Sequence, residues 1–165
     1  MNTKILPLAF AILFFSSCSN ADFGYNEKSA DNFLNVMAKL DEAHEKLLDN
    51  RWKTGIDTAD QLNNSDWRDV RSKSNLVSEM IAGTSELKHS EKANAYHTQI
   101  LKYMNDVNSN YFATLKKYLL SKDTTEQVSY KQQLIEIRKT LSDEENKSLE
   151  IQKKFLDDAG ISHGK

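Results

Sequence analysis

Apolar residues recur at spacings of three and four along most of the chain, which is the period of a helix with one buried side. In residues 26–50 this apolar face consists of Ala30, Phe33, Leu34, Met37, Leu40, Ala43, Leu47 and Leu48. The same spacing continues in three further segments, at residues 57–87, 91–121 and 124–159. The pattern therefore predicts four long helices, of which the second is the weakest because it is rich in Asn and Ser.

Glycines and small polar residues mark where these helices are expected to begin and end. Gly55 can adopt a positive φ in the first turn, and Ser90 is a natural N-cap for the third helix. Thr124 is expected to cap the fourth helix, with Gln127 reaching back in a capping box. Gly160 is the predicted stop of that helix.

Two of the predicted helices contain a candidate interruption. Asp57 or Thr58 would cap the second helix, but residues 63–65 could break it, with Ser65 capping a restart. The stretch Ser142-Asp143-Glu144-Glu145 interrupts the apolar stripe of the fourth helix and could restart the helix with a second capping box. We expect one bent or continuous helix there, with residues 143–145 on a solvated face.

Helices of similar length joined by short links favour antiparallel neighbours. We therefore expect an all-α fold, an up-down-up-down antiparallel four-helix bundle over residues 26–160, followed by a disordered tail at 161–165. The chain has a single proline, Pro7, and it shows none of the alternating patterns with glycine turns that indicate strands.

The first eighteen residues follow a different pattern. Lys4 precedes an apolar run at residues 5–15, and two serines separate this run from Cys18, the only cysteine of the chain. A charged start, a short apolar core and small residues are typical of a secretory signal, and the run is shorter than the roughly 20 residues that cross a bilayer. The sequence Phe15-Ser16-Ser17-Cys18 resembles the lipobox of bacterial lipoproteins, although leucine is usual where Phe15 stands.

This resemblance implies a signal peptide at 1–17, cleavage before Cys18 and a lipid on its sulfur. Residues 18–25 would form a lipidated polar tether, and two acyl chains are enough for stable anchoring. Ser19 directly after Cys18 resembles, by the enteric sorting rule, the signal for delivery to the outer membrane. Ordinary secretion with cleavage after Ala21 is the alternative.

The overall layout also resembles a group of small helical surface lipoproteins of spirochaetes and Bacteroidetes. The shared features are a short signal, a cysteine, a Tyr25-Asn26 start to the first helix and four helices. That group has no established activity, so the resemblance implies no catalytic residue.

Composition narrows the possible partners. The formal net charge is −2, and removal of Lys4 with a signal peptide would make it one charge more negative. Because nucleic-acid binding depends on clustered positive charge, we expect no nucleic-acid partner. A single cysteine allows no internal disulfide and no zinc site built from several thiolates.

Candidate chemistry is sparse. Asp41 and Glu86 each precede a histidine, His44 or His89, by three residues, a spacing used in di-iron bundles. The first pair has Asp in place of Glu and the second falls at a predicted helix end, so we expect no metal and no cofactor. His97 and His163 add no recognisable ligand pattern.

No phosphate-binding loop, serine elbow or His-Glu-x-x-His motif occurs, and we expect no catalytic residues and no enzymatic activity.

Aromatic residues suggest where a partner could bind. The third helix carries Tyr96, Tyr103, Tyr111 and Tyr118, whose rings we expect to be buried beside the core with the hydroxyls in water. Trp52 and Trp67 flank the start of the second helix. They are expected either to close one end of the bundle or to contact a partner protein.

The sequence thus predicts a lipid-anchored envelope protein without enzymatic activity, attached to the membrane through Cys18. It would contact another envelope protein or have a structural role. The alternative is a periplasmic bundle that binds a small ligand or a metal.

Overall fold

The computed structural model describes residues 15–161, with their side chains from residue 21 onward. Most of the predicted signal peptide and of the predicted tail lies outside these residues. The described part is all-helical and contains no strand. This purely helical secondary structure confirms the all-α prediction. It is the structure that the three-and-four spacing of the apolar residues indicates.

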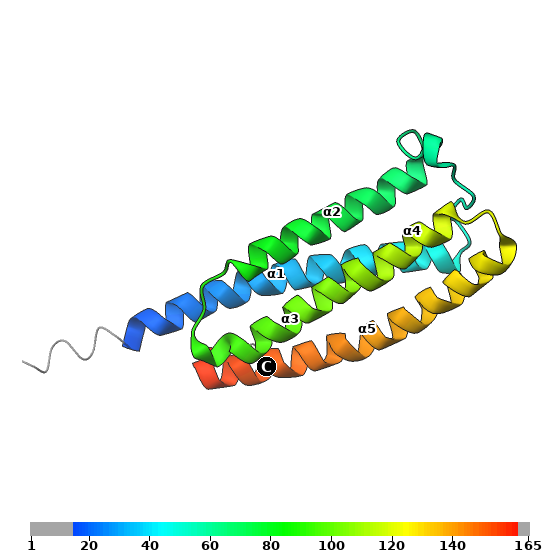
Figure 1. Cartoon of the computed structure of the whole chain (residues 1–165). Helices are drawn as coiled ribbons and strands as arrows, with labels where there is room; N and C mark the ends of the chain where they lie inside the picture. Colours follow the sequence, from blue (N-terminus) through cyan, green and yellow to red (C-terminus); the bar gives the residue numbers. More distant parts are fainter. Residues whose placement is uncertain (1–14, 162–165) are drawn as a thin grey trace, which may run out of the picture.

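Four long helical segments make up this fold. They are α1 (Phe15–Leu48), α2 (Ser65–Ser85), the combined segment α3 (Asn94–Asp106), η3 (Val107–Phe112) and α4 (Ala113–Leu120), and finally α5 (Thr124–Ala159). Two short 3₁₀ turns, η1 (Thr58–Asp60) and η2 (Glu91–Ala93), precede α2 and α3. Figure 1 shows the four segments lying lengthwise beside one another, with α1 extending past the ends of its neighbours.

The first helix begins earlier than the sequence predicts. It starts at Phe15, so the expected polar tether at residues 18–25 is helical. The tether prediction is wrong for Asp22 and Tyr25, which are both 2% exposed and pack against the rest of the bundle. Tertiary contacts hold this segment in the helix, although its polar composition gave no apolar stripe from which to predict it.

The second helix is interrupted where its Asn-rich start suggested. Residues 61–64 separate η1 from α2, and the side chain of Asn64 accepts hydrogen bonds from the amides of Asp66 and Trp67. The N-cap is therefore Asn64, one residue before the predicted Ser65. An Asn side-chain oxygen reaches these amides as readily as a serine hydroxyl does.

The last helix is continuous from Thr124 to Ala159, as expected, but its cap differs from the prediction. Asp123 is the N-cap, and its carboxylate accepts hydrogen bonds from the amides of Thr125 and Glu126. The predicted capping box is wrong because Gln127 donates to the carbonyl of Ser121 instead. Gly160 ends the helix at φ 69°, and Ser90 caps η2, both as predicted.

A π-helical segment, η3, lies within the predicted third helix. Tyr111 and Phe112, adjacent residues of this segment, are both fully buried. Polar contacts from α2 meet this segment, since Ser74 donates to Asn108 at 2.7 Å and Asn108 donates to Ser78 at 2.8 Å. π-Helical turns are frequent at functional sites, so the surroundings of η3 are of interest.

The core runs the length of the molecule between these helices. Its largest fully buried side chains are Tyr96, Tyr103, Tyr111, Phe33, Phe112, Phe155, Leu40, Leu47, Ile100, Met104, Leu115 and Leu119. Three of the four predicted stripe tyrosines are among them, and the fourth, Tyr118, is 8% exposed. The prediction that these rings are buried is confirmed.

Candidate functional site

The site that the sequence marks most clearly is the start of α1, which contains Cys18 in its first turns. One helical turn later, the carboxylate of Asp22 accepts hydrogen bonds from the amide of Ser90 at 3.0 Å and from its hydroxyl at 2.8 Å. These bonds join α1 to the link between α2 and α3. Asp22, four residues after Cys18, is therefore buried and held in the fold.

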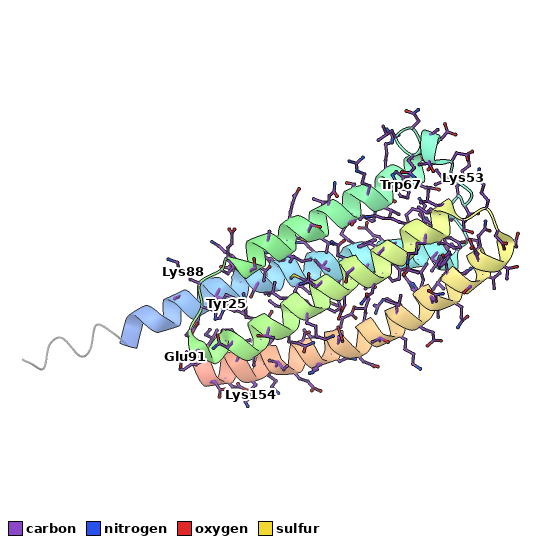
Figure 2. The ribbon with its side chains drawn as sticks, in the orientation of Figure 1. Tyr25, Lys53, Trp67, Lys88, Glu91 and Lys154 are labelled. Atoms are coloured by element: carbon purple, nitrogen blue, oxygen red, sulfur yellow. The ribbon has the colours of Figure 1, made fainter. Side chains whose placement is uncertain are left out.

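Aromatic and imidazole rings surround this contact. The Tyr25 hydroxyl lies 3.1 Å from Nδ1 of His97, and the His89 and His97 ring centroids are 4.3 Å apart. Nδ1 of His89 lies 2.9 Å from the carbonyl oxygen of Ser90, to which it donates as the Nδ1–H tautomer. Figure 2 shows Tyr25, Lys88 and Glu91 together at this end of the molecule.

Burial and charge perturb two of these groups. Burial lowers the pKa of His97, and the neighbouring His89 lowers it further because two cationic rings would repel each other. Burial raises the pKa of the Tyr25 hydroxyl, and Tyr96 adds to that effect. Both shifts favour the neutral forms of His97 and Tyr25, which suits their packing between helix ends.

The two tryptophans have different environments at the opposite end. Trp52 is 5% exposed, its indole N–H donates to the carbonyl of Ala43 at 3.0 Å, and the ammonium of Lys46 lies 3.8 Å from its ring centroid. Trp67 is half-buried and packs against the core from α2. Trp52 thus closes this end of the bundle and has little surface to offer, whereas Trp67 keeps surface for the predicted partner contact.

A buried polar network in the core was not predicted from the sequence. Glu145 of α5 is 7% exposed, accepts a hydrogen bond of 2.7 Å from the Tyr103 hydroxyl and lies 3.3 Å from the guanidinium of Arg138. Arg138 also reaches Asp41 of α1 at 2.8 Å. The expectation that Glu145 lies on a solvated face is wrong, because this residue faces α3 and its charge is paired inside the bundle.

A second tyrosine–imidazole pair lies close to Arg138 and Asp41 of this network. Nδ1 of His44 lies 3.0 Å from the hydroxyl of Tyr111. Burial lowers the pKa of His44, the charge of Arg138 lowers it further, and Asp41 partly opposes both effects. The hydroxyls of Tyr103 and Tyr111 are therefore bonded to protein groups, so the predicted exposure of these hydroxyls to water is wrong for both.

A surface groove of about 470 Å³ lies beside η3, between α4 and α5. Its lining mixes carboxylates with neutral polar and apolar groups, among them Asp106, Asn110, Lys117, Glu136, Ile137 and Glu144. Lys102 pairs with Glu144 and, at 2.8 Å, with Asp106. The other oxygen of Glu144 is buried without a hydrogen-bond partner in the described structure. The groove therefore presents carboxylates next to apolar side chains such as Ile137.

Sequence reasoning missed this groove, and the only local sign was the polar run at residues 108–110 inside an otherwise apolar helix. Across the described residues, no group of three or more His, Cys, Asp or Glu side chains is arranged to hold a metal ion. A search of the same residues finds no helix with the length and hydropathy needed to cross a membrane.

No protein-family model, curated protein or solved structure matches this chain. The functional argument therefore rests on the chain's own residues and on their arrangement.

Proposed function

We propose that this chain is a lipid-anchored protein of the bacterial envelope, attached through Cys18, that uses its helical surface to contact another envelope protein or to serve a structural role. The observation that supports this most is the position of Asp22. Its buried contacts with Ser90 begin one helical turn after the cysteine of the lipobox-like segment. Asp22 is thus held in the folded domain one helical turn from the proposed attachment point, as expected of a surface-bound domain.

The proposed arrangement of the helices is an up-down-up-down antiparallel bundle. Short links support it: only residues 86–93 separate α2 from α3–η3–α4, and only residues 121–123 separate α4 from α5. Links this short reverse the chain direction between neighbours that pack lengthwise. Contacts of α1 with α2, of α2 with α3, and of α5 with α3, α4 and α1 agree with this order around the bundle.

The proposed location is the outer membrane, with the mature chain beginning at the lipidated Cys18. Ser19 at the following position supports delivery there by the enteric rule.

Mass spectrometry of the full chain expressed in a bacterial host and isolated from its envelope tests the attachment. We expect a mature N-terminus at Cys18 that carries diacylglycerol, and retention in the membrane fraction. The Cys18→Ser variant should lose both the lipid and the retention. An unacylated terminus at Asp22, which cleavage after Ala21 would produce, would refute the proposal.

The groove beside η3 supports a second candidate function, the binding of a small polar ligand. Its volume of about 470 Å³ lies within the range of small-molecule sites, roughly 300–1,000 Å³. Glu144 and Glu136 line this groove, and their carboxylates would attract an ammonium donor.

Titration with alkylamines, followed by chemical shifts of the groove residues, tests this second function. Saturable shifts that disappear in Glu144→Gln but persist in Glu150→Gln would support it, because Glu150 is an exposed acid on the same helix. Shifts that are unaffected by either change, or the absence of shifts, would contradict it.

A further inference from the structure

We infer that the bundle stands directly on the lipid surface, with the end formed by the start of α1, the α2–α3 link and the end of α5 against the membrane and with the Phe23 ring in the interfacial layer. This inference rests on the proposed lipid attachment at Cys18. It adds the orientation of the domain and names a residue that contacts lipid.

The first argument is distance along α1. Cys18 and Phe23 lie in the same continuous helix, five residues apart, which corresponds to about 7.5 Å at 1.5 Å per residue. Helical side chains lean toward the N-terminus, so the Phe23 ring points back toward the level of Cys18. The polar layer of one leaflet is roughly 5–7 Å thick, which brings the ring within reach of it.

The second argument is the rigid connection. A flexible tether would let the domain swing away from the membrane, but the two hydrogen bonds from Ser90 hold Asp22 against the α2–α3 link. Tyr25, which is 2% exposed, adds ring contacts with His89, His97, Tyr96 and Phe155 on the other elements of this end. The helix that carries the lipid is thus fixed to the domain from its second turn after Cys18.

The third argument is the exposure of Phe23. Its side chain is 52% exposed, although Asp22 directly before it and Tyr25 two residues after it are buried. A large apolar ring on the outer face of a helix, beside a lipid attachment point, is accounted for if it contacts lipid, because aromatic rings favour the membrane interface.

Electrostatic attraction alone does not hold this end of the bundle on the membrane. Lys88 and Lys154 lie at this end, as Figure 2 shows, but so do Glu91 and the acids at the end of α5, Asp157 and Asp158. Because positive and negative groups are mixed, attraction to anionic lipids is weak. The lipid chains and the apolar ring are therefore the groups expected to hold this end on the surface.

Quenching of tryptophan fluorescence by brominated lipids tests the orientation. The full-length, lipidated Phe23→Trp variant is placed in phosphatidylcholine vesicles with brominated acyl chains and compared with unbrominated vesicles. The matched control is Leu34→Trp, a residue of α1 that is 54% exposed and lies about 16 Å further along the helix. The native Trp52 and Trp67 lie at the opposite end of the bundle and give the unquenched background; Trp52 donates to the carbonyl of Ala43, about 37 Å along α1 from Cys18.

We expect the emission added by Trp at position 23 to be quenched at least twofold more than that added at position 34. Equal quenching at the two positions, or none at position 23, in a chain whose lipid is confirmed by mass would overturn this inference and leave the proposed attachment standing. A chain that carries no lipid overturns both.

Discussion

The hydroxyl of Tyr103 donates a hydrogen bond of 2.7 Å to Glu145, linking α3 to α5 across 42 residues of sequence. Both side chains are buried, and Arg138 completes the pairing of the carboxylate. Burial raises the pKa of Tyr103, and the adjacent carboxylate raises it further, so the tyrosine stays neutral and acts as the donor.

Removal of that hydroxyl should destabilise the fold. In Tyr103→Phe, Glu145 keeps Arg138 but loses its buried donor, and we expect the free energy of unfolding to fall by about 1–3 kcal/mol. Urea unfolding measures the change. Tyr130→Phe is the control, because Tyr130 is only half-buried on α5 and its hydroxyl makes no hydrogen bond within the described residues. Equal losses in the two variants would contradict a specific role for the Tyr103–Glu145 bond.

The contact between Asp22 and Ser90 should also contribute to stability. Asp22→Ala leaves the Ser90 amide and hydroxyl without their shared acceptor, and we expect a loss of about 1.5–3 kcal/mol, typical of hydrogen bonds to a charged group. Thermal unfolding would show it. Asp31→Ala, an exposed acid on the same helix, should change stability by less than about 0.5 kcal/mol. A stable Asp22→Ala protein would mean that the start of α1 is held by its rings alone.

Stability should fall as the pH decreases through the range in which histidine titrates. The folded protein lowers the pKa of His44, chiefly by burial and by Arg138, and that of His97, chiefly by burial and by His89. The unfolded chain therefore binds protons first as the pH falls below about 6.5, and the free energy of unfolding decreases until the pH is below the folded pKa values.

Urea unfolding between about pH 8 and about pH 5.5, above the range of the carboxylates, measures this dependence. The His97→Gln variant should show a shallower loss of stability over that range, because one of the perturbed groups is gone. An unchanged slope would contradict the assignment of His97 as a contributor.

Substitutions of the two tryptophans should have different effects, with Trp52 important for folding and Trp67 for partner binding. Trp52→Ala removes a buried indole and its hydrogen bond to Ala43, and we expect a loss of about 3–5 kcal/mol in the free energy of unfolding. Whether this variant captures a partner would therefore depend mainly on whether it still folds.

Trp67→Ala should cost less stability and is the informative change for the predicted partner contact. Capture from envelope extracts with a folded Trp67→Ala protein should lose the partner that the wild-type protein retains. Capture that is unaffected would remove Trp67 from the contact surface. Near-ultraviolet circular dichroism of each variant gives the control for folding.

Several parts of the fold and of the candidate site could be predicted because their signals are local. The spacing of the apolar residues indicated the helices, and Ser90, Gly55 and Gly160 occupy the conformations that their chemistry favours. The site residue Cys18 was likewise singled out from adjacent residues alone. Its lipidation stays a prediction until it is measured.

Other parts depend on residues far apart in the sequence. Glu145 follows two other acids and has the local pattern of an exposed residue, yet it is buried because Tyr103 and Arg138 pair with it. Asp22 lies in a polar stretch that reads as a tether, but Ser90, 68 residues away, holds it in the fold. The groove beside η3 likewise exists only where two helices meet.

The sequence by itself therefore determined that this protein is built from helices and where most of them end, because hydrogen bonding within a helix and its caps involve residues only a few positions apart. Only the tertiary structure decided which polar side chains are buried and how the start of α1 is fixed to the bundle. The physical reason is that burying a charge or a polar group is favourable only when a distant partner is brought to it, and the packing of the helices supplies that partner.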